Sequence, residues 1–318
     1  MLDAYANTLI KGKGVKTTTD QAAGKDLMHE VLSRILRVLP VMPAIDWTVS
    51  TAAVWQRGRW QSDFVGFPET PTQALDDLLH IDAQKQSLQL NTAQFVVGLP
   101  ANNALLWGAR GAGKSSLIHG LLQQYAKDGL RLVELRKDEL QELSEIVARL
   151  SAEPYRFIVF CDDLSFEEDD ASYKMLKSAL EGSVFKGAAN VIFYATSNRR
   201  HLLPERGSDN SKSGLVDGEL HHGEAVEEKI SLSDRFGLWL SFYPFRQEAY
   251  LDMAEVWVHR LVADYDPSQI DTEEFRRETF RQDALRWALA RGVRSGRTAS
   301  HFARHWVGQK LLDGKIER

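Results

Sequence analysis

The chain has 318 residues, with 39 Lys and Arg residues against 44 Asp and Glu residues, and therefore a formal net charge of −5. Hydrophobic residues make up 43% of it and charged residues 26%, which excludes a long disordered chain and argues against a strongly basic nucleic-acid coat, while leaving a local basic face open. A single cysteine, Cys161, excludes an internal disulfide framework and is typical of the reducing cytosol. No apolar run approaches the roughly 18 residues of a membrane span, and the N-terminus lacks the apolar stretch of a signal peptide. We therefore expect a cytoplasmic protein of about two domains that has no membrane partner.

The N-terminal part of the sequence gives weak structural signals. Residues 11–25 are small and polar and predict a linker or an exposed loop. Residues 26–39 have apolar side chains at helical spacing, and Pro40 ends the predicted helix. Residues 40–70 are rich in aromatic side chains among Pro, Gly and Thr, and they predict a small packed unit of short strands or turns.

From residue 75 onward, predicted strands and helices alternate, a pattern that favours a parallel sheet covered on both faces. The predicted strands are 103–108, 130–135, 156–163, 190–198 and 237–245. The predicted helices between them are 75–97, with a break near Ile81, 115–126, 138–150 and 172–180. Residues 204–229 are too polar to pack and predict a long mobile loop. After Pro244 the predicted elements are all helical: 247–265, 272–291 and 298–312.

Residues 108–115, GARGAGKS, fit the pattern G-x-x-x-x-G-K-[ST] of a phosphate-binding P-loop between a predicted strand and a predicted helix. The glycines let backbone N–H groups turn toward a phosphate, and the helix N-terminus adds partial positive charge. We expect Lys114 to reach the outer phosphates and the Ser115 hydroxyl to ligate Mg²⁺. The residues expected around the phosphates are Gly108, Ala109, Arg110, Gly111, Ala112, Gly113, Lys114, Ser115 and Ser116. The alternative, a chance glycine-rich turn, does not account for the strand and helix on its two sides.

Polar residues end the next two buried strands. Asp162 follows the apolar run before it, where a P-loop hydrolase needs a carboxylate to hold Mg²⁺. Asp163 occupies the position that orients or deprotonates the attacking water, although it could instead cap the acidic loop that follows. Residues 196–198, Thr-Ser-Asn, end the following strand and could position water against the terminal phosphate, or form an ordinary turn.

Two arginines are candidates for contacts with the phosphates. Arg235 lies just before the last predicted strand and could stabilise transition-state charge in a neighbouring subunit. Arg297 lies at the start of the last predicted helix and could reach the nucleotide from the helical region. The alternative for both is a solvated or ion-paired surface arginine.

Residues 275–318 hold 11 basic and 4 acidic residues, a balance of +7 (11 − 4) in a chain of net charge −5. Such a region could meet nucleic acid or an acidic partner, but we favour solvated helix faces. The cluster of Trp47, Trp55 and Trp60 could stack on bases, but we favour core packing. His221 and His222 lack the ligand spacing of a metal site, so we assign them no role.

These motifs, in this order, resemble those of the AAA+ ATPases. Residues 75–88 resemble the segment before the P-loop, 108–115 Walker A, 157–163 Walker B, 194–198 sensor 1, 233–237 the arginine-finger segment and 295–299 sensor 2. The segments 99–117, 160–177, 194–205 and 224–245 are similar to a bacterial family of predicted AAA+ ATPases known mainly as a domain of unknown function. That family name supplies no client or pathway.

The resemblance implies an α/β fold, with a parallel-sheet P-loop NTPase core over residues 73–245 and a helical lid over 246–318. Residues 1–72 would form a small N-terminal region that recognises a partner. The implied ligands are ATP and Mg²⁺, with the metal on Ser115 and Asp162. The further implied roles are adenine contacts near Leu79 and Ile81, sensor 1 at Asn198, a trans-acting finger at Arg235 and sensor 2 at Arg297.

One residue departs from the AAA+ pattern, because most of these proteins have Asp-Glu where this chain has Asp162-Asp163. Aspartate is one methylene shorter, and a misplacement of about 1 Å can cost about 10²-fold in rate. Hydrolysis is therefore expected to be slow or to require assembly on a partner.

The first functional hypothesis is an oligomeric ATPase that couples hydrolysis to the remodelling or loading of a macromolecule, either a protein or a nucleic acid. The second is a nucleotide-dependent switch or loader that acts on nucleic acid or a helicase with little hydrolysis. A third is a small-molecule P-loop kinase, against which the 233–237 segment and the helical C-terminal region argue.

Overall fold

The structure is a computed structural model in which the chain divides into two units, Met1–Ala44 and Ile45–Arg318. It describes residue 30 and residues 45–58, 62–67, 74–167, 170–181, 188–200, 202, 214–216, 219–221, 232, 234–263 and 278–316. In the first unit only Glu30 is described, and it is helical. The linker expected over 11–25 and the rest of the helix expected over 26–39 therefore lie outside the described residues.

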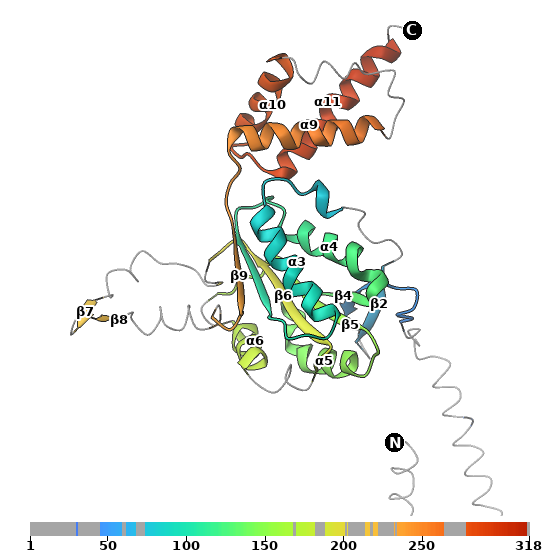
Figure 1. The fold of residues 1–318 in the computed structure, drawn as a ribbon, viewed down its shortest axis with the longest axis vertical. Helices are drawn as coiled ribbons and strands as arrows, with labels where there is room; N and C mark the ends of the chain where they lie inside the picture. The colour runs from blue at the N-terminus through green and yellow to red at the C-terminus, as the bar shows by residue number, and fades with distance from the viewer. Residues whose placement is uncertain are drawn as a thin grey trace, which may run out of the picture. The chain divides into compact units, whose positions relative to one another are not determined.

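A seven-stranded sheet forms the core of the second unit (Figure 1). In spatial order its strands are β2 (Asp63–Gly66), β1 (Ala52–Gln56), β4 (Leu130–Leu135), β5 (Arg156–Cys161), β6 (Val191–Ser197), β3 (Ala104–Gly108) and β9 (Leu238–Phe242). All neighbouring strands are parallel except β1 and β2, which are antiparallel. The side chains of β4, β5 and β6 are almost all buried, as in parallel sheets that are covered on both faces.

Helices cover the two faces of this sheet. One face carries the 3₁₀ turn η1 (Leu75–Asp77), α3 (Asp82–Val96) and α4 (Lys114–Tyr125), and the other carries η3 (Lys137–Glu142), α5 (Leu143–Ser151) and α6 (Ala171–Glu181). Successive side chains of a strand point to opposite faces, so Leu106 packs with the first set and Leu105 with the second. The predicted α/β class with a parallel sheet is confirmed, and η3 with α5 stands where a single helix was predicted.

Hydrogen bonds of Tyr194 connect β6 to α3. Its hydroxyl accepts a hydrogen bond from Asn91 Nδ2 at 3.0 Å and shares another with Thr92 Oγ1 at 2.9 Å. Burial raises the pKa of Tyr194 to about 12, so the phenol stays neutral. Because Thr196 and Asn198 follow closely along the chain, this buried contact also sets their position.

Three helices form the C-terminal part of the chain, which we call the lid: α9 (Gln247–Ala263), α10 (Glu278–Ala290) and α11 (Gly296–Ile316). Their shared core holds Tyr250, Phe280, Phe302 and Trp306, all buried. The Tyr250 hydroxyl on α9 donates a hydrogen bond to the Ala284 carbonyl of α10 at 3.0 Å. None of the helices in the described ranges combines the length and the apolar character needed to cross a membrane.

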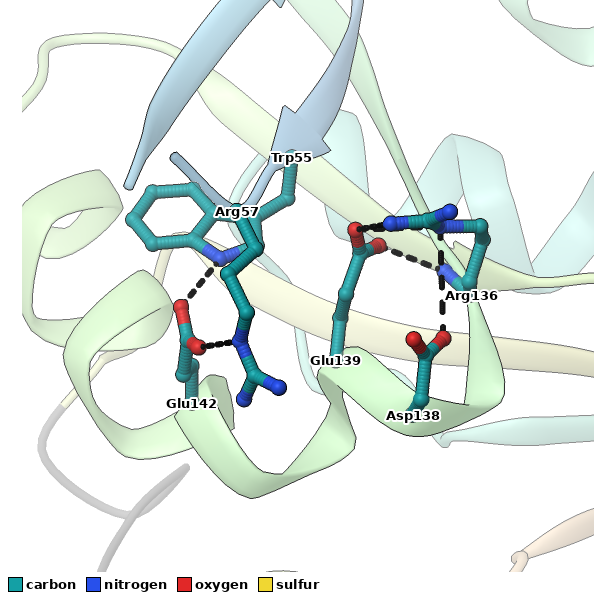
Figure 2. Close-up of polar contacts among 6 residues, drawn as sticks. All are labelled: Trp55, Arg57, Arg136, Asp138, Glu139 and Glu142. Atoms are coloured by element: carbon teal, nitrogen blue, oxygen red, sulfur yellow. Dashed lines mark hydrogen bonds and ion pairs between the residues drawn. The ribbon is translucent and has the colours of Figure 1, made fainter. Parts of the chain in front are cut away.

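Strands β1 and β2 belong to the central sheet, which differs from the boundary expected between residues 72 and 73. β1 pairs in parallel with β4, and Trp47, Trp55 and Phe64 enter the core between the sheet and α5. Figure 2 shows Trp55 and Arg57 converging on Glu142, which accepts hydrogen bonds from Trp55 Nε1 at 2.7 Å and Arg57 Nε at 2.5 Å. Trp47, Trp55 and Phe64 are thus part of the core and not of an independent unit, whereas Trp60 lies outside the described residues.

The polar segment 204–229 contains two short strands, β7 (Gly214–Val216) and β8 (Glu219–His221), which pair antiparallel. We expected only a loop there. Asp217-Gly218, between the strands, is a common hairpin-turn dipeptide and was the sequence signal for this pairing. The rest of the segment lies outside the described residues.

Replacing Trp55 by alanine tests whether β1 is part of the main folding unit. Trp55 is 2% exposed, and its loss is expected to lower the free energy of unfolding by about 3–5 kcal/mol in urea denaturation followed by circular dichroism. Val49→Ala is the control, because Val49 is 78% exposed and its loss should change little. An unchanged main transition in Trp55→Ala would contradict this placement of β1.

Candidate nucleotide-binding site

The P-loop lies at a crossover point of the sheet. β3 lies between β6 and β9, although β4 is the next strand of the sheet along the chain. The carboxyl end of such a strand is a topological switch point, where open α/β sheets bind their ligands. α4 begins there at Lys114, and Asp162 and Asn198 follow β5 and β6 at the same edge of the sheet. The topology therefore gathers motifs that are far apart in the sequence.

Gly108 is the point at which the P-loop leaves β3, and only glycine fits there. Its φ is +123°, and a Cβ atom would lie 2.0 Å from the carbonyl oxygen of Phe242 on β9. The same carbonyl accepts a hydrogen bond from the backbone N–H of Ala109 at 2.8 Å. Gly113, with φ of +93°, ends the loop where α4 begins. The backbones of β3 and β9 thus fix the entry of the P-loop.

Lys114 is held inside the P-loop with its ammonium group fully engaged. Nζ donates hydrogen bonds to the carbonyls of Gly108 at 3.0 Å and Ala109 at 2.8 Å, and to Asn198 Oδ1 at 3.1 Å. Burial lowers the pKa of Lys114, while the nearby charges of Asp162 and Asp163 raise it. A buried ammonium with these partners is ready to exchange carbonyl oxygens for phosphate oxygens.

Ser115 and Asp162 form an oxygen pair that fits Mg²⁺. Ser115 Oγ donates a hydrogen bond to Asp162 Oδ1 at 2.6 Å, and Thr196 Oγ1 donates to the same oxygen. Mg²⁺ prefers a few protein oxygens together with waters and phosphate oxygens, and two adjacent oxygens of this kind meet that need. No group of three or more His, Cys, Asp or Glu residues with metal-binding geometry occurs in the described part of the chain.

Asn198 bridges the P-loop lysine and the second carboxylate. Its Oδ1 accepts from Lys114, and its Nδ2 donates a short hydrogen bond to Asp163 Oδ1. Asp163 has a φ of +49°, and its backbone N–H donates to Thr196 Oγ1 at 2.9 Å. A non-glycine residue in this left-handed region is held there by its surroundings and is often found at functional sites.

The N-terminus of α11 contacts the P-loop directly. The backbone N–H of Gly296 donates to the Gly111 carbonyl at 2.9 Å, and a Cβ at Gly111 would meet Ser295 Oγ at 2.8 Å. Ser295 Oγ also accepts from the Thr298 N–H at 3.1 Å and so caps the helix. These contacts bring Arg297 to the P-loop.

A cavity of about 500 Å³ lies between the P-loop, η1 and the lid, a size typical of small-molecule sites. The sequence-predicted residues that line it are Leu79, Ile81, Arg110, Gly111, Ala112, Gly113, Lys114, Ser115, Ser116, Asp162, Asp163, Asn198 and Arg297. Gly108 and Ala109 lie behind Lys114 and hold its ammonium group. The lid adds an apolar wall of Phe245, Met253, Val256 and Trp257.

Arg235 does not line this cavity. Its Nη2 lies 2.7 Å from Glu181 Oε1 at the end of α6, and its side chain is 45% exposed. The structure therefore brings Arg235 to the surface and not to the nucleotide site of its own chain.

The cavity also contains residues that the sequence analysis did not assign to it. His301 and Arg304 follow the predicted Arg297 at helical spacing along α11, and they line the cavity with it. This spacing was the available signal, since residues three and four apart share one face of a helix. Thr196, noted only as part of a strand end, donates to the carboxylate of Asp162.

A second pair of side chains that was not predicted, His119 and Glu134, lies near Asp162, whose charge affects the pKa of both residues. His119 Nε2 on α4 is 3.5 Å from Glu134 Oε1 on β4. Burial lowers the pKa of His119 and raises that of Glu134, so both side chains are shifted toward their neutral forms. The negative charge of Asp162 raises the pKa of both residues, so it opposes the effect of burial on His119 and adds to the effect of burial on Glu134.

The fold resembles solved AAA+ ATPases. The Orc1 protein of Aeropyrum pernix, in a complex with DNA, matches with a TM-score of 0.50 and 15% identity, over 76% of this chain and 66% of that one. A point mutant of RuvB from Thermotoga maritima matches with a TM-score of 0.47 and 17% identity, over 74% of this chain and only 65% of that one. PCH-2 of C. elegans matches with a TM-score of 0.44 and 17% identity, over 71% of this chain and 63% of that one. At these identities the likeness concerns the fold alone.

The sequence comparison identifies the family. No curated protein matches this chain. The family described as "Protein of unknown function (DUF815)" matches residues 48–310, a range that includes β1, the P-loop, Asp162 and Arg297. The chain therefore belongs to the DUF815 family, and its fold is that of the nucleotide-binding AAA+ P-loop proteins.

Proposed function

We propose that this protein hydrolyses ATP to ADP and phosphate with Mg²⁺, as a homo-oligomer that remodels or loads a macromolecular partner. The observation that carries the proposal is the position of Asn198, which bridges Lys114 and Asp163 at the mouth of the P-loop. One side chain thus touches the group expected to bind phosphate and the group expected to act on water. This arrangement is expected of a hydrolase.

The charges in the cavity support a polyanionic ligand. Four permanent cations line it, namely Arg110, Lys114, Arg297 and Arg304, against the two carboxylates of Asp162 and Asp163. A third carboxylate, Asp77, is paired with Arg260 at 2.6 Å. The excess of two positive charges (4 − 2) favours a magnesium-bound triphosphate.

Each residue of the site has a role in this proposal. Ser115 and Asp162 hold the metal, and Lys114 binds the outer phosphates. Bound Mg²⁺ would supply charge neutralisation at the phosphate oxygens. Asp163 orients and deprotonates the attacking water, and Asn198 positions that water and the terminal phosphate.

Arg235 and Arg297 complete the proposed site from two directions. Arg297 reaches the phosphates from the lid, to which the P-loop is joined through Gly296. Arg235 acts on the nucleotide of a neighbouring subunit, and its ion pair with Glu181 would open on assembly. An arginine supplied in trans stabilises the charge that develops during phosphoryl transfer.

A second candidate function is a nucleotide-dependent switch with little hydrolysis. The observation that favours this function is the hydrogen bond that Asn198 Nδ2 donates to Asp163 Oδ1, because it engages the carboxylate that would otherwise act on water. If this bond persists when nucleotide binds, Asp163 is not free to act on water, and the bound nucleotide only fixes a conformation. The partner would then bind the ATP form, and release would need little turnover.

Lys114→Ala and Asp163→Asn separate binding from chemistry. Lys114→Ala is expected to weaken MgATP affinity by roughly 10–100-fold, because it removes a buried charged hydrogen-bond donor. Asp163→Asn is expected to leave affinity unchanged and to lower kcat by about 10²-fold. Affinity is measured by titration calorimetry and turnover by phosphate release, with exposed Lys127→Ala as the control. Full turnover in Asp163→Asn would contradict the assigned role, and negligible wild-type turnover with tight binding would favour the switch.

Mixing two inactive variants tests the action of Arg235 in trans. Lys114→Ala still supplies Arg235, and Arg235→Ala still supplies an intact P-loop, so the mixture is expected to hydrolyse ATP faster than either variant alone. Specific activity of the wild type should also rise with protein concentration. Arg286→Ala, an exposed arginine of α10, is the control and should behave as wild type. Wild-type activity in Arg235→Ala alone would rule out the trans role.

A further inference from the structure

Arg260 on α9 joins two parts of the cavity wall that come from different parts of the fold. Its Nη1 lies 2.6 Å from Asp77 Oδ2 on η1, and its guanidinium carbon lies 5.6 Å from the centre of the Trp257 ring. Asp77 and Trp257 both line the cavity, whereas Arg260 does not. Arg260 therefore lies behind the wall and connects its η1 side to its lid side.

A second contact between side chains links the same two parts of the fold. His80 Nε2, just after η1, lies 3.0 Å from Asp252 Oδ2 on α9. Between these two pairs, Leu79 lines the cavity and packs against the lid core. The segment 77–80 is thus tied to α9 on both sides of Leu79, which keeps this wall at a fixed separation from the lid.

Arg260 also neutralises a negative charge at this wall of the cavity, that of Asp77. Asp77 is an acidic residue in a cavity that otherwise favours an anion, and an unpaired carboxylate there would repel a nucleotide. The guanidinium of Arg260 cancels that charge from behind. It also packs over the Trp257 ring, whose flat surface suits an aromatic base.

We propose that Arg260 is a positioning residue for the nucleoside end of the site. Through Asp77 and Trp257 it sets the gap into which an aromatic base inserts between α9 and the 77–81 segment. Affinity for a nucleotide then depends on its base as well as on its phosphates. This inference rests on the nucleotide site proposed above, and it assigns a role to a residue that does not itself touch the ligand.

The test compares a ligand that has a base with one that has none. MgATP and magnesium tripolyphosphate are titrated into wild type, Arg260→Met and Arg281→Met by calorimetry. Arg260→Met is expected to weaken MgATP binding about tenfold, the effect of a lost base-stacking contact, and to leave tripolyphosphate affinity unchanged. KM for ATP should rise similarly, with kcat at saturating ATP preserved.

Arg281→Met is the matched control. Arg281 pairs with Glu248 at 2.8 Å within the lid, its side chain is 38% exposed against 36% for Arg260, and it does not line the cavity. Its loss should change neither affinity. Trp257→Leu should reproduce the base-selective loss of Arg260→Met, and it serves as the test if Arg260→Met does not fold.

The outcomes separate this inference from the proposed function. Equal weakening of both ligands by Arg260→Met, or no weakening of either, would overturn the positioning role while leaving the nucleotide site in place. A wild-type protein that binds neither ligand would overturn both proposals. Base-selective weakening in Arg260→Met but not in Arg281→Met supports the inference.

Discussion

The pairing of β3 with β6 on one side and β9 on the other is the constraint from which the site follows. β9 pairs with β3 as far as Gly108, where the backbones approach so closely that a Cβ would strike the Phe242 carbonyl. The P-loop therefore leaves the sheet in one direction, and α4 begins at once. Because β5 and β6 run parallel to β3, their polar ends reach the same edge without a long connecting loop. The geometry of the site is thus built into the sheet.

Around that edge, hydrogen bonds position the charged side chains of the site, and one of these, Lys114, would otherwise be costly to bury. Lys114 is 7% exposed, and it is satisfied by two P-loop carbonyls and by Asn198. Asn198 also donates a hydrogen bond to the carboxylate of Asp163, and Thr196 donates one to the carboxylate of Asp162. A phosphate that enters this network would exchange partners with Lys114 and change the hydrogen bonding of Asn198. The hydrogen bonds of Lys114 and Asn198, which stabilise the site, would therefore differ between the empty and the phosphate-bound site.

Local sequence signals predicted most of the sheet, the lid helices and the P-loop, because strand and helix periods and the GARGAGKS motif act over short distances. The place of β1 was missed because its partner β4 lies far along the chain and the Trp55 side chain could pack in several ways. The bridge from Lys114 through Asn198 to Asp163 could not be predicted for the same reason, since it joins three segments in space. Arg260 carries no motif at all, and its place behind the cavity follows only from the docking of α9.

The most direct measurement of the central claim is hydrogen–deuterium exchange of the full chain with and without MgATP, since each wall of the cavity reports separately. If ATP lies between the P-loop and the lid, backbone exchange should slow in three separate segments: 78–82, 108–117 and 296–304. The exposed C-terminal end of β1 and the α5 region should not change. Protection that is absent at saturating MgATP, or that falls outside these three segments, would contradict a nucleotide site in this cavity.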